Sequence, residues 1–135
     1  WEQGIPHLTF TGGEATLWPD LVELVQYAED VGLITGLQTN GRKLRDRAYL
    51  DQLLVAGLDH IQITLESHDP AIHDHMVGVV GAWQETVEGI KTVVDADIYM
   101  MTNTTMTTEN VGGIEETIAF AASLGVPTFG CNSLI

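Results

Sequence analysis

Apolar and polar positions follow two different periods along this chain, and their alternation predicts repeated β-α units. Five short runs rich in β-branched and apolar residues are typical of buried strands. These runs fall at about residues 5–11, 33–39, 58–65, 98–105 and 127–132. Between them, apolar residues recur at helical spacing. Strands that alternate with helices in this way indicate an α/β fold with a parallel sheet of about five strands.

Four amphipathic helices are predicted between the strands. The first covers about residues 19–31, with Pro19 suited to its first turn and Gly32 to its end. Crossovers of this length suit either an open doubly wound sheet or a barrel, and periodicity alone does not choose between them. The other helices are marked by Leu50, Leu53, Leu54 and Ala56 before Gly57, by Trp83, Val87, Ile90, Val93 and Val94, and by Ile114, Ile118, Ala121, Ala122 and Leu124 before Gly125.

Length and charge narrow the class of protein. With 135 residues, 44% of them hydrophobic, the chain suits one domain over residues 1–135, or part of one. Its 19 acidic and five basic residues give a net charge of -14, which argues against binding to nucleic acid or to an anionic membrane. No run approaches the roughly 20 apolar residues of a membrane span, and we expect a cytoplasmic protein.

Cysteine is almost absent from this chain. Cys131 is the only one, so these 135 residues cannot form an internal disulfide or a cysteine-rich zinc site. One thiolate is also too few to hold an iron-sulfur cluster.

Polar residues gather where the predicted strands end. Ligands of α/β proteins bind at the carboxyl ends of the strands, so these residues predict one polar ligand surface. Paired glycines leave backbone open to a ligand, and the carboxylate of Glu14 suits an amine. The segments are Thr11-Gly12-Gly13-Glu14, Gln38-Thr39-Asn40-Gly41, Thr64-Leu65-Glu66-Ser67, Asn103-Thr104-Thr105 and Cys131-Asn132-Ser133.

Several common kinds of site are not indicated. The sequence has no GxGxxG or GxxxxGK[ST] phosphate loop and no G-x-S-x-G nucleophile elbow. His68, His73 and His75, with Asp69 and Asp74, are compatible with a zinc site. We favour a loop and short helix there, with Asp69 and Pro70 at the helix start, and assign no metal ligand.

The strand-end motifs, in their order and spacing, resemble the central part of a radical S-adenosylmethionine (SAM) enzyme core. The resemblance covers nearly the whole chain and implies a partial (β/α)6 TIM-like barrel. The chain would supply strands two to six as a fragment of that core. It rests on Thr11-Gly12-Gly13-Glu14, Thr39-Asn40-Gly41, Ile63-Thr64-Leu65-Glu66-Ser67, Asp69-Pro70-Ala71-Ile72-His73-Asp74 with Gly78, and Asn103 before Asn110.

The resemblance also implies a role for each cofactor-binding residue. Gly12, Gly13 and Glu14 would hold the methionyl amine of SAM, while Thr64 would meet the carboxylate or ribose. Glu66 stands where the family often has aspartate, and it would accept hydrogen bonds from ribose hydroxyls. Asn103 would face the nucleoside. Thr39 and Asn40 would face SAM or substrate. We expect Glu14→Gln to weaken SAM binding with little loss of stability, because a strand-end carboxylate facing a groove is not core.

One family feature is missing from these residues: the CxxxCxxC loop that holds three irons of a [4Fe-4S] cluster. The resemblance implies that an intact parent carries the cluster and receives an electron from a reductant. The parent would cleave SAM to a 5′-deoxyadenosyl radical and take hydrogen from an unassigned small-molecule or peptide substrate. The alternatives are a catalytically silent SAM-binding or protein-interaction module, or an unrelated α/β-barrel enzyme. No catalytic residue is assigned.

Overall fold

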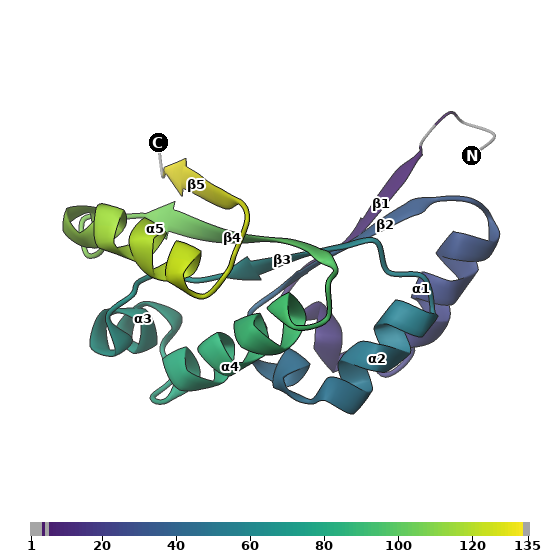
Figure 1. Ribbon diagram of the computed structural model, residues 1–135, viewed down its shortest axis with the longest axis horizontal. Coiled ribbons are helices and arrows are strands. Elements are labelled where there is room, and N and C mark those ends of the chain that lie inside the picture. The colour runs from purple at the N-terminus through teal and green to yellow at the C-terminus, as the bar shows by residue number, and fades with distance from the viewer. Residues whose placement is uncertain (1–3, 5, 134–135) are drawn as a thin grey trace.

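The described strands form one parallel sheet in the order β1-β2-β3-β4-β5 (Figure 1). The computed structural model describes residues 4 and 6–133. Every neighbouring pair is parallel, which confirms the predicted parallel sheet with strands in sequence order. β1 is an edge strand within the described residues. The strands are β1 His7–Phe10, β2 Ile34–Thr39, β3 His60–Thr64, β4 Tyr99–Met106 and β5 Phe129–Ser133.

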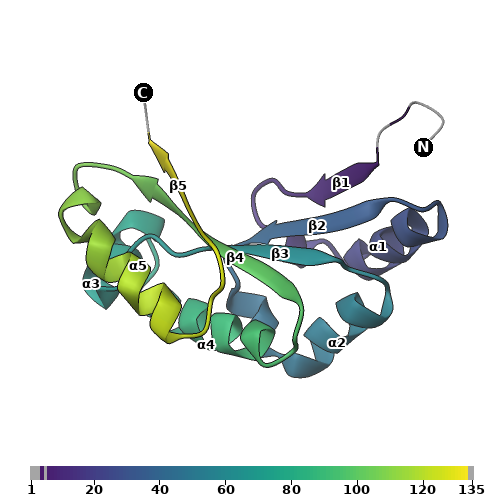
Figure 2. The same ribbon diagram turned by 45° about the horizontal axis from the view of Figure 1, so that its top comes forward.

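The helices lie along one side of the sheet and leave its other side uncovered (Figure 2). None of the described helices is both long and apolar enough to cross a lipid bilayer. The α-helices are α1 Leu21–Asp30, α2 Arg47–Val55, α3 Pro70–Val77, α4 Ala82–Val94 and α5 Ile114–Ser123. Short 3-10 turns precede three of these helices: η1 Ala15–Leu17 before α1, η2 Arg42–Arg45 before α2 and η3 Val111–Gly113 before α5.

Capping side chains explain where two of these helices begin. α2 starts before its apolar stripe because the Asp46 carboxylate accepts from the backbone N–H of Ala48, at 3.0 Å. The predicted short helix after the third strand is α3, where the Asp69 carboxylate accepts from Ala71 N–H at 2.7 Å. Pro70 occupies its first turn.

Residue 5, where the first strand was predicted to begin, lies outside the described residues.

The core lies between the sheet and the helices. Successive side chains of a strand point to opposite faces, and the apolar ones face the helices. Ile61 and Ile63 of β3 and Leu37 of β2 are at most 1% exposed, as are Leu53 of α2 and Ile90 of α4. The uncovered face therefore carries the alternate positions of each strand, which are mostly polar.

One buried hydroxyl in this core has no partner among the described residues. Thr102 of β4 is fully buried, and its Oγ1 makes no hydrogen bond there. Thr102→Val keeps the shape and removes the unpaired group, so we expect the free energy of unfolding to rise by about 1 kcal/mol. Urea denaturation followed by circular dichroism measures this change.

Thr104→Val is the matched control for that substitution. Thr104 is also fully buried in β4, but its Oγ1 donates to the backbone carbonyl of Leu65. Its replacement should lower the unfolding free energy by about 1 kcal/mol, because a buried acceptor loses its donor. Equal effects from both substitutions would contradict this account of Thr102.

Candidate functional site at the carboxyl ends of the strands

The loop after β1 has a backbone that only glycine adopts readily. Gly12 has φ 96° and Gly13 has φ 45°, both in the left-handed region. No atom lies within 4 Å of the position a Cβ would take at either residue. The loop therefore presents open backbone at the edge of the sheet, as the sequence predicted.

The carboxylate of Glu14 is bound by its own chain. Its Oε1 accepts from Thr16 N at 3.1 Å, Thr16 Oγ1 at 2.7 Å and Thr39 Oγ1 at 2.6 Å. Its Oε2 accepts from the backbone N–H of Asn40 at 2.7 Å. Glu14 therefore ties the ends of β1 and β2 together, and our expectation that its loss would hardly affect stability does not fit this geometry. The second lone pair of Oε2 is left for a ligand donor.

Thr39 and Asn40 complete this network at the end of β2. The Thr39 hydroxyl donates to Glu14 and accepts from Gly41 N at 3.1 Å, so it supports the carboxylate. Asn40 is fixed through its backbone carbonyl, which accepts from Thr86 Oγ1 at 2.9 Å, and through its Oδ1, which accepts from Arg42 N at 3.0 Å. The structure thus brings Glu14, Thr39 and Asn40 together as predicted and gives Thr39 an internal partner.

Thr64 and Asn103 lie side by side on the uncovered face. They are direct partners in the register between β3 and β4. Asn103 is 9% exposed, and its Oδ1 accepts from Asn132 Nδ2 of β5 at 3.2 Å. Three neighbouring strands therefore contribute polar side chains to one surface.

Glu66, which follows β3, is held from three directions. Its Oε2 accepts from Thr105 N at 2.8 Å, and its backbone carbonyl accepts from Asn110 Nδ2 at 2.8 Å. Its backbone N–H donates to Nδ1 of His73 at 3.2 Å. Burial raises the pKa of Glu66, and the Thr105 amide partly offsets this. Spacing alone did not assign a role to His73 or Asn110, because both reach Glu66 from other elements.

The basic residues of η2 are held by internal partners. Arg42 and Arg45 both pair with Glu85 of α4, and Lys43 Nζ donates to the Thr16 carbonyl at 2.7 Å. These contacts join η2 to α4 and to η1. They border a cavity of about 410 Å³ that Glu14 and Asn40 also line.

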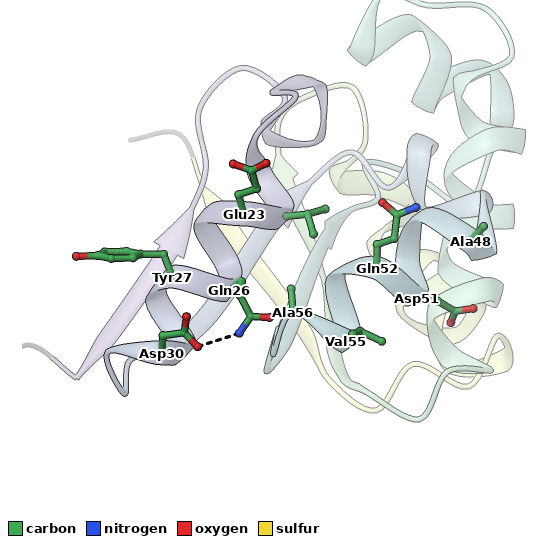
Figure 3. Close-up of a pocket in the computed structure, with 10 residues that line it drawn as sticks. Glu23, Gln26, Tyr27, Asp30, Ala48, Asp51, Gln52, Val55 and Ala56 are labelled. Carbon is green, nitrogen blue, oxygen red and sulfur yellow. Dashed lines mark hydrogen bonds between the residues drawn. The ribbon is translucent and has the colours of Figure 1, made fainter.

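A second hollow, of about 610 Å³, lies between α1 and α2 on the helix side of the sheet (Figure 3). Val22, Val55 and Ala56 give it apolar walls, and Glu23 and Asp51 lie at its border. None of the predicted cofactor-binding residues lines it. The strand ends carry the polar groups, so we place the candidate site there.

The histidines considered for a metal site have other partners. His68 Nδ1 lies 3.2 Å from Thr117 Oγ1, His75 pairs with Glu109, and His73 accepts from Glu66 N. Within residues 4 and 6–133, no three His, Cys, Asp or Glu side chains are placed to hold a metal ion. Cys131 lies exposed on β5.

Comparison with known proteins identifies the family. The sequence profile of the radical SAM superfamily matches residues 1–121. The chain belongs to the radical SAM superfamily. Membership supports SAM-dependent radical chemistry in general, and the family implies SAM and a [4Fe-4S] cluster as cofactors.

Two relatives align with most of this radical SAM chain. It is 32% identical over 126 residues to an AdoMet-dependent heme synthase of Methanosarcina barkeri, covering 93% of this chain and 36% of the relative. It is 36% identical over 121 residues to a PqqA peptide cyclase of Rhizobium meliloti, covering 90% of this chain and 32% of the relative. The chain therefore spans about a third of the length of these relatives.

Two solved structures share the fold of this chain. The crystal structure of SuiB from Streptococcus suis superposes with a TM-score of 0.81 at 18% identity, covering 96% of this chain and 29% of SuiB. A TYW1 structure with a bound lysine-pyruvate adduct gives 0.78 at 18% identity, covering 96% and 42%. The five-stranded parallel sheet is thus part of the family's TIM-like barrel, as predicted.

Proposed function

We propose that this chain binds SAM across the carboxyl ends of β1 to β4, as the core of a radical SAM enzyme. Two carboxylates held in fixed positions carry the proposal. Glu14 keeps one lone pair of Oε2 after its four internal bonds. Glu66 is held through Oε2, and its Oε1 has no partner among the described residues. SAM carries an ammonium group, a sulfonium and two ribose hydroxyls, which suit two such acceptors.

The remaining residues would complete the site. Gly12 and Gly13 would offer backbone groups to the methionyl end beside Glu14, because nothing crowds them. Thr64 and Asn103 would face the ribose and nucleoside from adjacent strands. In an intact parent enzyme, SAM bound beside a reduced [4Fe-4S] cluster would supply the radical chemistry that the family implies.

The residues of this chain do not fit the cluster itself. The single Cys131 cannot supply the several thiolates that a [4Fe-4S] cluster needs. The proposal therefore assigns the cluster ligands, and the contact with the reductant, to other residues of the parent. The names of relatives include a peptide cyclase and a heme synthase, which supports a small-molecule or peptide substrate as part of this proposal.

Titration with SAM tests the location of the site. Asn103→Ala removes a polar side chain at the carboxyl ends and should weaken SAM binding by about fivefold to tenfold in calorimetry. His60→Ala is the control, because His60 lies at the opposite end of β3, on the same uncovered face. Equal losses in both variants, or no SAM binding to the unsubstituted chain, would overturn the location.

A second measurement separates enzyme from silent module. The full-length parent, with its cluster reconstituted and reduced, should convert SAM to 5′-deoxyadenosine. SAM binding without that product would support the catalytically silent alternative.

A further inference from the structure

His73 is a buried polar residue next to the candidate site. It lies on α3 and is 1% exposed. Its Nδ1 accepts a hydrogen bond from the backbone N–H of Glu66, seven residues earlier, at 3.2 Å. It also lines a cavity of about 150 Å³ together with Thr64 and Arg42. A buried imidazole that bonds a site residue calls for an explanation beyond packing.

The hydrogen bond fixes the chemical state of the imidazole. A backbone N–H is only a donor, so Nδ1 must be unprotonated to accept from it. The ring is then neutral and carries its proton on Nε2. Burial lowers the pKa of His73, and the Asp74 carboxylate partly offsets this. The environment therefore favours the form that the hydrogen bond requires.

The other polar groups of Glu66 also have internal partners. The Asn110 amide holds its carbonyl, and the Thr105 amide holds Oε2. With His73 on the backbone N–H, residues of α3, of β4 and of the turn before η3 fix Glu66. These three bonds fix the position of the carboxylate. Its Oε1 has no partner among the described residues.

We propose that His73 is a positioning residue, which orients Glu66 through its backbone so that Oε1 meets a ribose hydroxyl of the bound nucleoside. This inference rests on the proposed function and deepens it, because it names the residue on which Glu66 depends. His73 itself does not touch the ligand. Its effect passes entirely through the Glu66 backbone.

The proposal predicts a pH effect of known sign. As pH falls through the lowered pKa of His73, Nδ1 gains a proton, the acceptor is lost, and ribose binding weakens. The charged groups near His73 are Glu66 after β3, Asp74 of α3, and Arg42 of η2, which pairs with Glu85 of α4. Because Glu66 also titrates in acid, a variant whose acceptor cannot titrate is needed.

Two substitutions provide the test. His73→Asn can place an amide oxygen where Nδ1 stands, whereas His73→Leu removes the acceptor at similar volume. Adenosine and 2′,3′-dideoxyadenosine are titrated into each protein by NMR. His73→Leu should weaken the binding of adenosine by about fivefold and leave the affinity for the dideoxy compound unchanged. His73→Asn should restore the binding of adenosine. The loss of adenosine affinity at acid pH should be smaller in His73→Asn than in the unsubstituted chain.

Equal weakening of both ligands by His73→Leu would show a purely structural role and overturn the proposal. If the unsubstituted chain does not distinguish the two ligands, the assignment of Glu66 under the proposed function fails instead. The positioning role is then judged without ligand, from the Glu66 amide resonance and carboxyl titration. A change in His73→Leu that His73→Asn reverses supports it, and no change overturns it. If His73→Leu does not fold, the positioning role is tested with His73→Asn and with the pH titration of the Glu66 amide resonance.

Discussion

Gly89→Ala should destabilise this chain by about 3 kcal/mol or more, near the upper end of overpacking effects. Gly89 is buried in α4 where the helix meets the turn after β2. An added Cβ would lie 2.0 Å from the carbonyl oxygen of Gly41 and 2.9 Å from its carbonyl carbon. These are backbone atoms, so no side chain can rotate away. The helix propensity of alanine returns only about 1 kcal/mol.

The expected loss extends to the candidate site, because the same turn contains Asn40. Thr86 of α4 donates to the Asn40 carbonyl, and Asn40 N–H donates to Glu14. A shift of α4 away from Gly41 would therefore disturb the Glu14 network. SAM binding should weaken in whatever fraction of Gly89→Ala stays folded.

Gly112→Ala is the matched control for this prediction. Gly112 lies in η3, and nothing lies within 4 Å of the position its Cβ would take. Its substitution should change the unfolding free energy by less than about 0.5 kcal/mol. Urea unfolding of the two variants gives the comparison. Coincident midpoints would mean that α4 can move off the turn without cost.

The sequence predicted the order and type of the elements well, for a physical reason. Strands β1 to β4 carry β-branched or apolar residues on the face that meets the helices, so their period is visible in the sequence. Helix starts were less precise. The first helix was predicted from residue 19 and begins at Leu21, and α2 begins at Arg47 because Asp46 caps it. Caps are local hydrogen bonds, which periodicity does not detect.

The candidate site was predictable only in part. Their positions at the ends of predicted strands indicated that Glu14, Thr39 and Asn40 would share one polar surface, and the structure places them in one network. The sequence did not indicate that the Thr39 hydroxyl would donate its hydrogen bond to Glu14. Nor did it indicate that His73 would bond the Glu66 backbone, because that contact depends on how α3 lies against the segment that follows β3.

Glu14→Gln should lower both stability and SAM affinity. If the side-chain oxygen of glutamine replaces Oε1, its amide group faces the N–H of Asn40, and two donors oppose each other. Losing this charge-assisted bond should cost about 1.5 to 3 kcal/mol of unfolding free energy. Under the proposed function, the same change removes the acceptor for the methionyl ammonium and weakens SAM binding by roughly tenfold or more.

The two effects can be separated by measuring them together. Glu115→Gln is the control: it removes one negative charge at an exposed position in the first turn of α5, where the expected change is below about 1 kcal/mol. Thermal melts and SAM calorimetry on both variants, best in the full-length parent, give the comparison. A lower melting temperature with unchanged SAM affinity would leave Glu14 as a structural tie between β1 and β2 and remove it from the SAM site. Lower affinity with an unchanged melt would instead contradict the four-bond network, because a carboxylate so bound cannot be neutralised without cost to the fold.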